Sequence, residues 1–281
     1  MEQPVKFGPD GNMIGMYSPA SGQGDVCCLL INSGIVHRIG PHRLNVLIAR
    51  GLAARSLASL RFDLSGLGDS RPASSAASYG DQAVADIRAA MDFVERERGT
   101  RQRFVIFGIC SGAVNAYHAA LADPRIVGAL MLDGFWYRTR WTEPVRLWKR
   151  FWSLSPRKIF DAIRRRLKRS ARPPAREAAP QVEIFGLEGS GNPPREQFAR
   201  AMNQLDARGV GLFLLYTSSV TGLVSYSAQI AQAFRGEPFT RRLRCEAHAE
   251  IDHTAVSLDA QRRMTEIVSS WVAGFAAARK T

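Results

Sequence analysis

The sequence of 281 residues is poor in cysteine and has no long uninterrupted apolar run. Its four cysteines, Cys27, Cys28, Cys110 and Cys245, are too few and too scattered for a disulfide framework. The adjacent pair lies in the apolar run CCLLI, where buried thiols are expected. No run of about eighteen apolar residues is present, so we expect no membrane-spanning helix. The first residues, MEQPVKFGPDGN, lack the basic start and apolar run of a signal peptide, so a cytoplasmic protein is expected.

Motifs for metals, dinucleotides and nucleic acids are also missing. No pair of cysteines or histidines has metal-ligand spacing beside a third ligand. The stretch RFDLSGLGDS (61–70) lacks the third glycine of a dinucleotide loop and does not lead directly into a helix. It is better explained as a loop whose turns are fixed by Asp63 and Ser70. We therefore expect no metal, no cofactor and no nucleic-acid partner.

Acidic residues are scarce between Arg138 and Arg176. This segment has fourteen Lys or Arg and two acids, so it carries about +12 of the net charge of +13. Within it, residues 157–169 have the pattern of a basic amphipathic helix, which can lie on an anionic membrane surface or dock an acidic protein. An acidic acyl carrier protein is one such partner. The alternative is a solvated surface whose arginines keep the protein soluble.

Apolar runs alternate with helical patterns over most of the remaining chain. This alternation predicts a mostly parallel sheet with helices on both faces, and ligands bind such sheets at the carboxyl ends of the strands. A hairpin is expected around residues 9–12 and a helix opening at Pro41. Further strands are expected at 25–31, 57–63, 103–108, 126–132, 209–216 and 241–248, and further helices at 80–98, 111–122, 194–207, 223–235 and 256–278.

The stretch FGICSGA (107–113) lies between a predicted strand and a predicted helix. Gly108 and Gly112 stand two residues to either side of Cys110, which is the pattern of a strained strand-to-helix turn that carries a nucleophile. With Ser111 as nucleophile, a bulky isoleucine would take one of the small flanking positions. The spacing therefore favours Cys110, and a helix N-terminus and a nearby histidine both favour a reactive thiolate. The alternative is an inert structural thiol.

At these residues the chain resembles the α/β-hydrolase superfamily, specifically members with a cysteine in place of the elbow serine. It looks most similar to the exosortase-system-associated hydrolases, and dienelactone hydrolases share the Gly-x-Cys-x-Gly elbow. The motifs are NSGIVHRIGPHR, RFDLSGLGDS, FGICSGA and DHT, and the resemblance covers roughly 20–135 and 205–278. It implies an α/β-hydrolase core of residues 1–134 and 181–281, with a basic, aromatic-rich helical cap, 135–180, inserted after the sixth strand.

The resemblance also implies a catalytic histidine just before the last helix, which is His253. His248 ends a predicted strand and is a weaker rival. The acid usually follows the strand at 209–216, but here twenty residues without Asp or Glu follow Tyr216. Some superfamily members draw their acid from the end of the preceding strand, so Asp133 is expected to orient the imidazole. Asp252 adjoins the histidine and is expected to fix the loop instead.

An acyl-transfer site also needs two backbone N–H groups for the oxyanion. The amide of Ser111 is the first. The second is expected from the loop after strand 25–31, where Gly34 allows a turn and Ile35 supplies the donor.

Four further residues are expected to bind substrate. His37 and Arg38 either contact an anionic substrate group or tie their loop to the protein. Trp136 and Trp141 begin an aromatic stretch that could roof an apolar acyl site.

Together these expectations describe an acyl-transfer enzyme, a (thio)esterase or an acyltransferase. A Cys110–His253–Asp133 triad would act on a small acyl ester or thioester through an acyl-cysteine. Two alternatives remain: a catalytically inactive binding protein with this fold, and a peripheral membrane protein that uses its basic cap.

Overall fold

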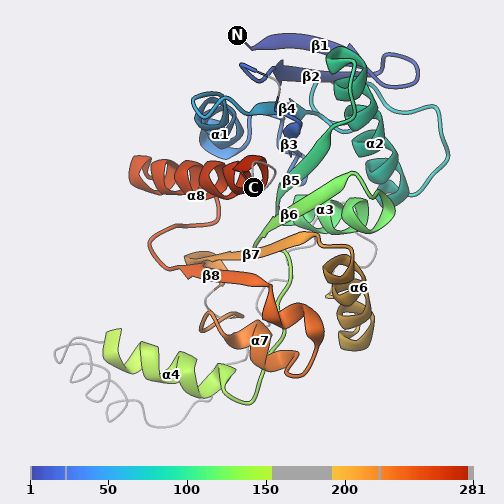
Figure 1. Cartoon of the computed structure of the whole chain (residues 1–281). Coiled ribbons are helices and arrows are strands. Elements are labelled where there is room, and N and C mark those ends of the chain that lie inside the picture. The colour runs from blue at the N-terminus through green and yellow to red at the C-terminus, as the bar shows by residue number, and fades with distance from the viewer. Residues whose placement is uncertain (1, 23, 154–191, 221–222, 278–281) are drawn as a thin grey trace, which may run out of the picture.

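A computed structural model describes residues 2–22, 24–153, 192–220 and 223–277. Its centre is an eight-stranded sheet with the strand order β1-β2-β4-β3-β5-β6-β7-β8 (Figure 1). The N-terminal hairpin is antiparallel and joins β4 in an antiparallel pairing, whereas every later pairing is parallel. The strands are β1 (Gln3–Phe7), β2 (Met13–Ser18), β3 (Val26–Leu30), β4 (Ala58–Phe62), β5 (Arg103–Ile109), β6 (Ile126–Leu132), β7 (Gly211–Thr217) and β8 (Arg244–His248).

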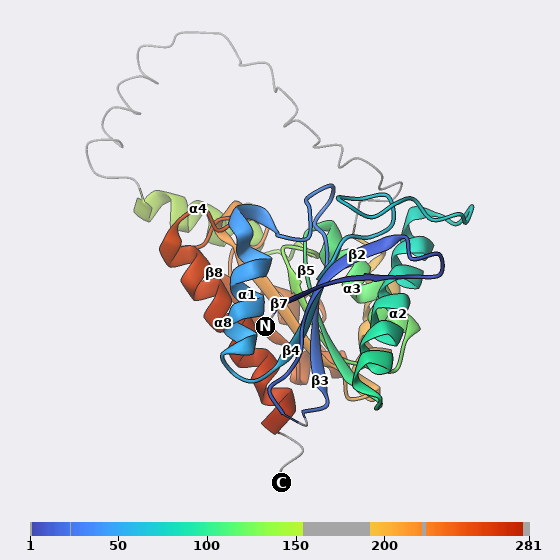
Figure 2. The ribbon, with the colours of Figure 1, turned by 90° about the horizontal axis from the view of Figure 1, so that it is seen from above.

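Helices cover both faces of the sheet. Figure 1 shows α1 and α8 on one face and α2, α3 and α6 on the other, and Figure 2 shows the same layers from above. This arrangement confirms the predicted α/β-hydrolase fold. The α-helices are α1 (Leu44–Ala53), α2 (Tyr79–Arg98), α3 (Ser111–Ala122), α4 (Thr142–Ser153), α6 (Arg195–Ala207), α7 (Gln229–Ala233) and α8 (Leu258–Ala277), and three short 3₁₀ turns lie at Pro41–Arg43, Ser218–Val220 and Pro238–Arg241.

The continuous apolar run of β3 is explained by burial on both faces. Alternate side chains of a strand point to opposite faces. Cys27 and Leu29 accordingly pack in the cluster under α2, α3 and α6, and Cys28 and Leu30 pack in the cluster under α1 and α8. Both cysteines are fully buried, and burial raises the pKa of each thiol. The expectation of buried structural thiols is therefore confirmed.

Two predicted helices differ from the structure. The helix expected to open at Pro41 begins at Leu44, because His42 and Arg43 have positive φ angles that end the 3₁₀ turn. The helix expected at 223–235 shortens to α7. Here the Gln229 side chain accepts a hydrogen bond from the Ser225 amide and donates to two backbone oxygens, so side-chain contacts replace helical ones.

The predicted cap is described only at its start. Phe135 and Tyr137 pack in the core, and α4 follows with Trp148 64% exposed. The predicted amphipathic helix at 157–169 and the predicted end of the cap near residue 180 lie outside the described residues. Among the described residues, no helix is both long enough and apolar enough to cross a bilayer.

Candidate active site

The turn between β5 and α3 is closely packed around Cys110. Its φ of 55° and ψ of −115° form a strained conformation that costs a non-glycine residue about 1–3 kcal/mol. A Cβ atom at Gly108 would lie 2.1 Å from the Gly112 carbonyl oxygen, and one at Gly112 would lie 2.5 Å from the Asn32 carbonyl oxygen. Both positions therefore require glycine. The strained residue between them is Cys110, as the spacing predicts.

The neighbouring Ser111 has a different set of contacts. It is the first residue of α3 and only 3% exposed. Its hydroxyl oxygen accepts a hydrogen bond from the Gly34 amide at 2.6 Å. The serine side chain thus fixes the loop after β3, whereas Cys110 is partly exposed at the strand end.

His253, in the loop between β8 and α8, meets Asp133, which follows β6. The His253 Nδ1 atom lies 2.7 Å from Asp133 Oδ2. The carboxylate is almost fully buried and follows the end of β6. Thr217, the last residue of β7, donates its amide to Oδ1 at 2.8 Å and its hydroxyl to Oδ2 at 2.6 Å. The structure therefore brings the carboxylate at the end of β6 to the histidine, in the place where no acid follows β7.

Hydrogen bonding raises the pKa of His253 to about 10. The bond to Asp133 contributes most and a bond to Cys110 comes next, while burial lowers the pKa by a smaller amount. Both the carboxylate and the cysteine therefore favour the protonated form of the His253 imidazole. This chain of contacts has the order of a nucleophile, a proton carrier and an orienting acid.

The loop after β3 lies against the elbow. Gly34 has a positive φ of 53°, as expected of a residue that allows this turn, and its amide donates to the Ser111 hydroxyl. The Ile35 amide makes no hydrogen bond to any described residue, and its exposed position suits an oxyanion donor. The Asn32 side chain holds the loop by donating to Val36 O at 2.7 Å and accepting from the Leu64 amide at 2.7 Å.

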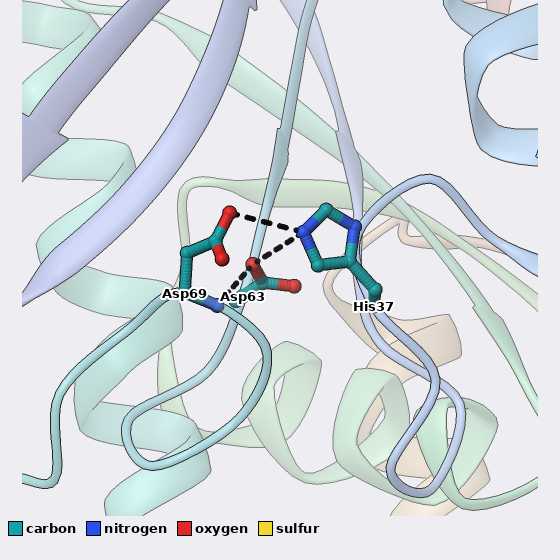
Figure 3. A group of neighbouring side chains, drawn as sticks. All are labelled: His37, Asp63 and Asp69. Carbon is teal, nitrogen blue, oxygen red and sulfur yellow. Dashed lines mark hydrogen bonds and ion pairs between the residues drawn. The ribbon is translucent and has the colours of Figure 1, made fainter.

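His37 and Arg38 are turned toward carboxylates of this chain. The Arg38 guanidinium contacts both Asp63 and Asp69, and its backbone amide donates to Asp63 at 2.6 Å. The His37 Nε2 atom lies 3.2 Å from Asp69 and 3.6 Å from Asp63 (Figure 3). These contacts match the loop-anchoring alternative rather than substrate binding. The side chains of His37, Asp63 and Asp69 are close enough to chelate a metal ion. The Arg38 guanidinium, however, already supplies a cation to both carboxylates.

The remaining predicted residues lie elsewhere. Trp136 is partly buried against the core, with its amide 3.1 Å from Asn192 Oδ1, so it does not form an open roof. Trp141 is 50% exposed and lines a separate cavity. His248 lies between Glu246 and Glu250, at 2.9 and 2.8 Å, away from the Asp133 carboxylate.

Three residues near the histidine have roles in holding its loop. Asp252 accepts hydrogen bonds from the Thr254 and Val256 amides, as expected of a residue that fixes the loop. The Ser219 hydroxyl accepts a hydrogen bond from the His253 amide at 3.0 Å. Neither Ser219 nor Thr217 was predicted. Their only signal is the polar run TSS (217–219), which begins with the last residue of β7 and reaches the place where the acid is otherwise expected.

Comparison with known proteins identifies the family of the chain. The model of a family described as serine aminopeptidase, S33, matches residues 34–181, just over half of the chain. A search of curated proteins finds no match.

Solved structures of hydrolases share the fold. An esterase from Pyrococcus furiosus aligns at a TM-score of 0.58 and 14% identity, over 96% of this chain and 91% of that chain. An α/β serine hydrolase without a lid from Xanthomonas campestris gives 0.52 and 13%, over 96% and 94%. The esterase domain of a Rhodothermus marinus protein gives 0.52 and 15%, over 96% and 97%.

The elbow glycine provides a first test. In Gly108→Ala the new methyl group collides with backbone atoms of the helix start, which cannot move independently. We expect a loss of about 3 kcal/mol or more in the free energy of unfolding, measured by urea denaturation. The control is Gly80→Ala, at a helical position with nothing within 4 Å, where we expect little change or a gain of up to about 1 kcal/mol. Equal effects of the two substitutions would contradict the close packing.

The His253–Asp133 pair provides a second test. A histidine whose pKa is raised from 6.5 to about 10 contributes its full stability below pH 6.5, and the contribution is lost as pH rises through 10. We therefore expect the difference in unfolding free energy between wild type and His253→Gln to be largest at pH 6 and to shrink by pH 10. Asp133→Asn should show the same trend, because it removes the other partner. A difference that is constant from pH 6 to 10 would rule out the ion pair.

Proposed function

The chain belongs to the serine aminopeptidase S33 family, and from this premise we propose that it is an acyl-transfer enzyme with a cysteine nucleophile. Family and fold support a hydrolytic enzyme. The finer assignment is carried by one observation: Cys110 holds the strained elbow position between two glycines that admit no Cβ atom, and the Ser111 hydroxyl is engaged by the Gly34 amide. The function is a (thio)esterase or acyltransferase acting on an ester or thioester.

The proposed reaction has two steps. The Cys110 sulfur attacks the carbonyl carbon of the substrate, and the Ser111 and Ile35 amides receive the oxyanion. When the tetrahedral intermediate collapses, the bond to the leaving alcohol or thiol breaks and His253 gives that group its proton. Water or an acceptor alcohol or amine then attacks the acyl-cysteine while His253 takes up a proton. The thiol is released and the product carries the acyl group.

The contacts of His253 suit a cysteine nucleophile. Its pKa is raised first by Asp133 and next by Cys110, so both neighbours favour the protonated imidazole. A cysteine beside a histidine can transfer its proton before it attacks, and the protonated imidazole can then donate to the leaving group.

Thioesters fit this chemistry well. Exchange of one thioester for another at Cys110 is nearly isoenergetic, so transfer to an acceptor competes with hydrolysis. The outcome depends on whether water is excluded from the site. The resemblance to exosortase-system-associated hydrolases stays a prediction, as does the binding of an acidic carrier protein or an anionic membrane by the basic segment.

Acyl adducts test the nucleophile directly. After mixing with a panel of acyl thioesters and esters, intact-protein mass spectrometry should detect one acyl group on wild type and on Ser111→Ala, and none on Cys110→Ala. In His253→Ala we expect acylation slower by about 10²–10⁴-fold, because the proton carrier is missing. An adduct that disappears only in Ser111→Ala would identify the serine instead. No adduct with any substrate, and ordinary thiol reactivity at Cys110, would favour an inactive binding protein.

The loop contact of Ser111 predicts a graded effect. Removing its hydroxyl frees the Gly34 amide, and a hydrogen bond of this kind is worth about 1 kcal/mol. We expect Ser111→Ala to slow acylation by about fivefold to tenfold without abolishing it. Ser74→Ala removes an exposed hydroxyl that donates to the Asp10 carboxylate, and it should leave the rate unchanged. An unchanged rate in Ser111→Ala would show that the oxyanion loop does not depend on this contact.

A further inference from the structure

A cavity of about 690 Å³ opens between the start of α4 and the helix α7. We call it the arginine cavity. Three arginines line it, Arg140, Arg195 and Arg235, together with Trp141 and small side chains of the α7 region. No Asp or Glu is among its lining residues. The cavity thus collects positive charge from three separate parts of the chain.

These arginines differ from most others on the surface. Arg125, for example, contacts three carboxylates, and Arg103 and Arg242 each contact one. Within the described part of the chain, none of the three cavity arginines contacts a carboxylate. Two of them lie over aromatic rings instead, those of Trp141 and Phe234, each at 5.4 Å. Their guanidinium donors therefore remain available to an anion.

The walls of the cavity are connected by hydrogen bonds. The Tyr226 hydroxyl lies 2.6 Å from the Thr139 hydroxyl and donates to Gln232 at 2.8 Å, which ties the loop before α4 to α7. The Gln229 side chain donates to the Tyr137 carbonyl at 3.0 Å and adds a second tie. The cavity is thus formed without a ligand, so little ordering cost opposes binding.

A short stretch of chain connects the cavity to the end of β6, where Asp133 lies. Thr139 follows Asp133 by six residues, so their Cα atoms lie within about 20 Å of each other. Figure 2 places α4 at the same end of the sheet as the loops that follow the parallel strands. The arginine cavity and the elbow that follows β5 therefore lie toward the same end of the sheet.

We propose that the arginine cavity binds the phosphate groups of a thiol carrier that delivers the acyl group to Cys110. Guanidinium groups bind phosphate in a bidentate geometry, and three of them can neutralise more than one phosphate charge. The half-exposed Trp141 adds a flat apolar face for the rest of the carrier. The substrate class is then a thioester of a phosphorylated thiol. The acyl group in this proposal rests on the proposed function, whereas the phosphate site does not.

Binding can be measured without catalysis in Cys110→Ala. Isothermal titration calorimetry would compare coenzyme A, phosphopantetheine and pantetheine, which share the thiol arm and differ in their phosphate groups; coenzyme A also carries an adenosine. We expect coenzyme A to bind and pantetheine to bind at least about tenfold more weakly. Phosphopantetheine binding like coenzyme A would place the phosphate of the arm in the cavity, as on a carrier protein. Binding of coenzyme A alone would place the nucleotide phosphates there. Equal binding of coenzyme A and pantetheine would overturn the proposal.

Substitutions locate the site. In the Cys110→Ala background, Arg195→Gln and Arg235→Gln should each raise the Kd for coenzyme A by about tenfold, and more when combined. Arg96→Gln makes the same charge change at an exposed position of α2 and should leave the Kd unchanged. Each single variant is used only if its melting temperature matches the parent, so the test does not depend on the double variant folding. Equal effects of Arg96→Gln and Arg195→Gln would reduce the binding to general charge attraction and overturn the site.

The two proposals can fail separately. Phosphate-dependent binding to the cavity with no acyl adduct on Cys110 would remove the proposed function and leave the site. Acylation by simple esters with no difference between phosphorylated and plain thioesters would leave the function and remove the site.

Discussion

The hydrogen bond between His253 and Asp133 is the contact on which the candidate active site depends, because it joins two strand ends to the loop before the last helix. Parallel pairing of β6 and β7 sets Leu132 beside Leu215, so the residues that follow both strands emerge at the same edge of the sheet. Asp133 is fixed there by the amide and hydroxyl of Thr217 before it meets the imidazole. A buried carboxylate needs such donors, since an unpaired one would be costly to desolvate. The acid therefore works from the end of β6 because β7 supplies its hydrogen bonds.

Backbone packing at the elbow connects this triad to the oxyanion loop. Gly112 touches the Asn32 carbonyl so closely that no side chain fits, and the Ser111 hydroxyl holds the Gly34 amide. The position of Cys110 and the position of the loop after β3 are thus set by the same few contacts. On the other side of the loop, Arg38 is anchored to the buried Asp63. Cys110 and the loop after β3 are consequently packed as one unit, which the proposed oxyanion site requires.

Local patterns in the sequence were enough to predict the sheet, most helices and the elbow, whereas the approach of Asp133 to His253 was predicted from the resemblance to α/β-hydrolases. Glycine spacing defines the elbow, and continuous apolar runs mark strands buried on both faces. The contacts of Thr217 were not predictable, because they depend on the register between β6 and β7. Nor could sequence decide whether Arg38 contacts a substrate or Asp63, since both partners suit a guanidinium. The shortened α7 follows from side-chain hydrogen bonds of Gln229 that override helical propensity, which a periodic pattern does not reveal.

The adjacent cysteine and serine divide two tasks that the site needs. The strained position between the two glycines is the one that the proposed nucleophile needs, and Cys110 occupies it. The next residue begins the helix and braces the loop after β3, which describes Ser111. In the proposed mechanism a cysteine replaces the serine for which the family is named, and a thiol beside a histidine can transfer its proton before it attacks. The Asp133 carboxylate, held by two bonds from Thr217, raises the pKa of His253 and so favours the protonated imidazole that this mechanism uses.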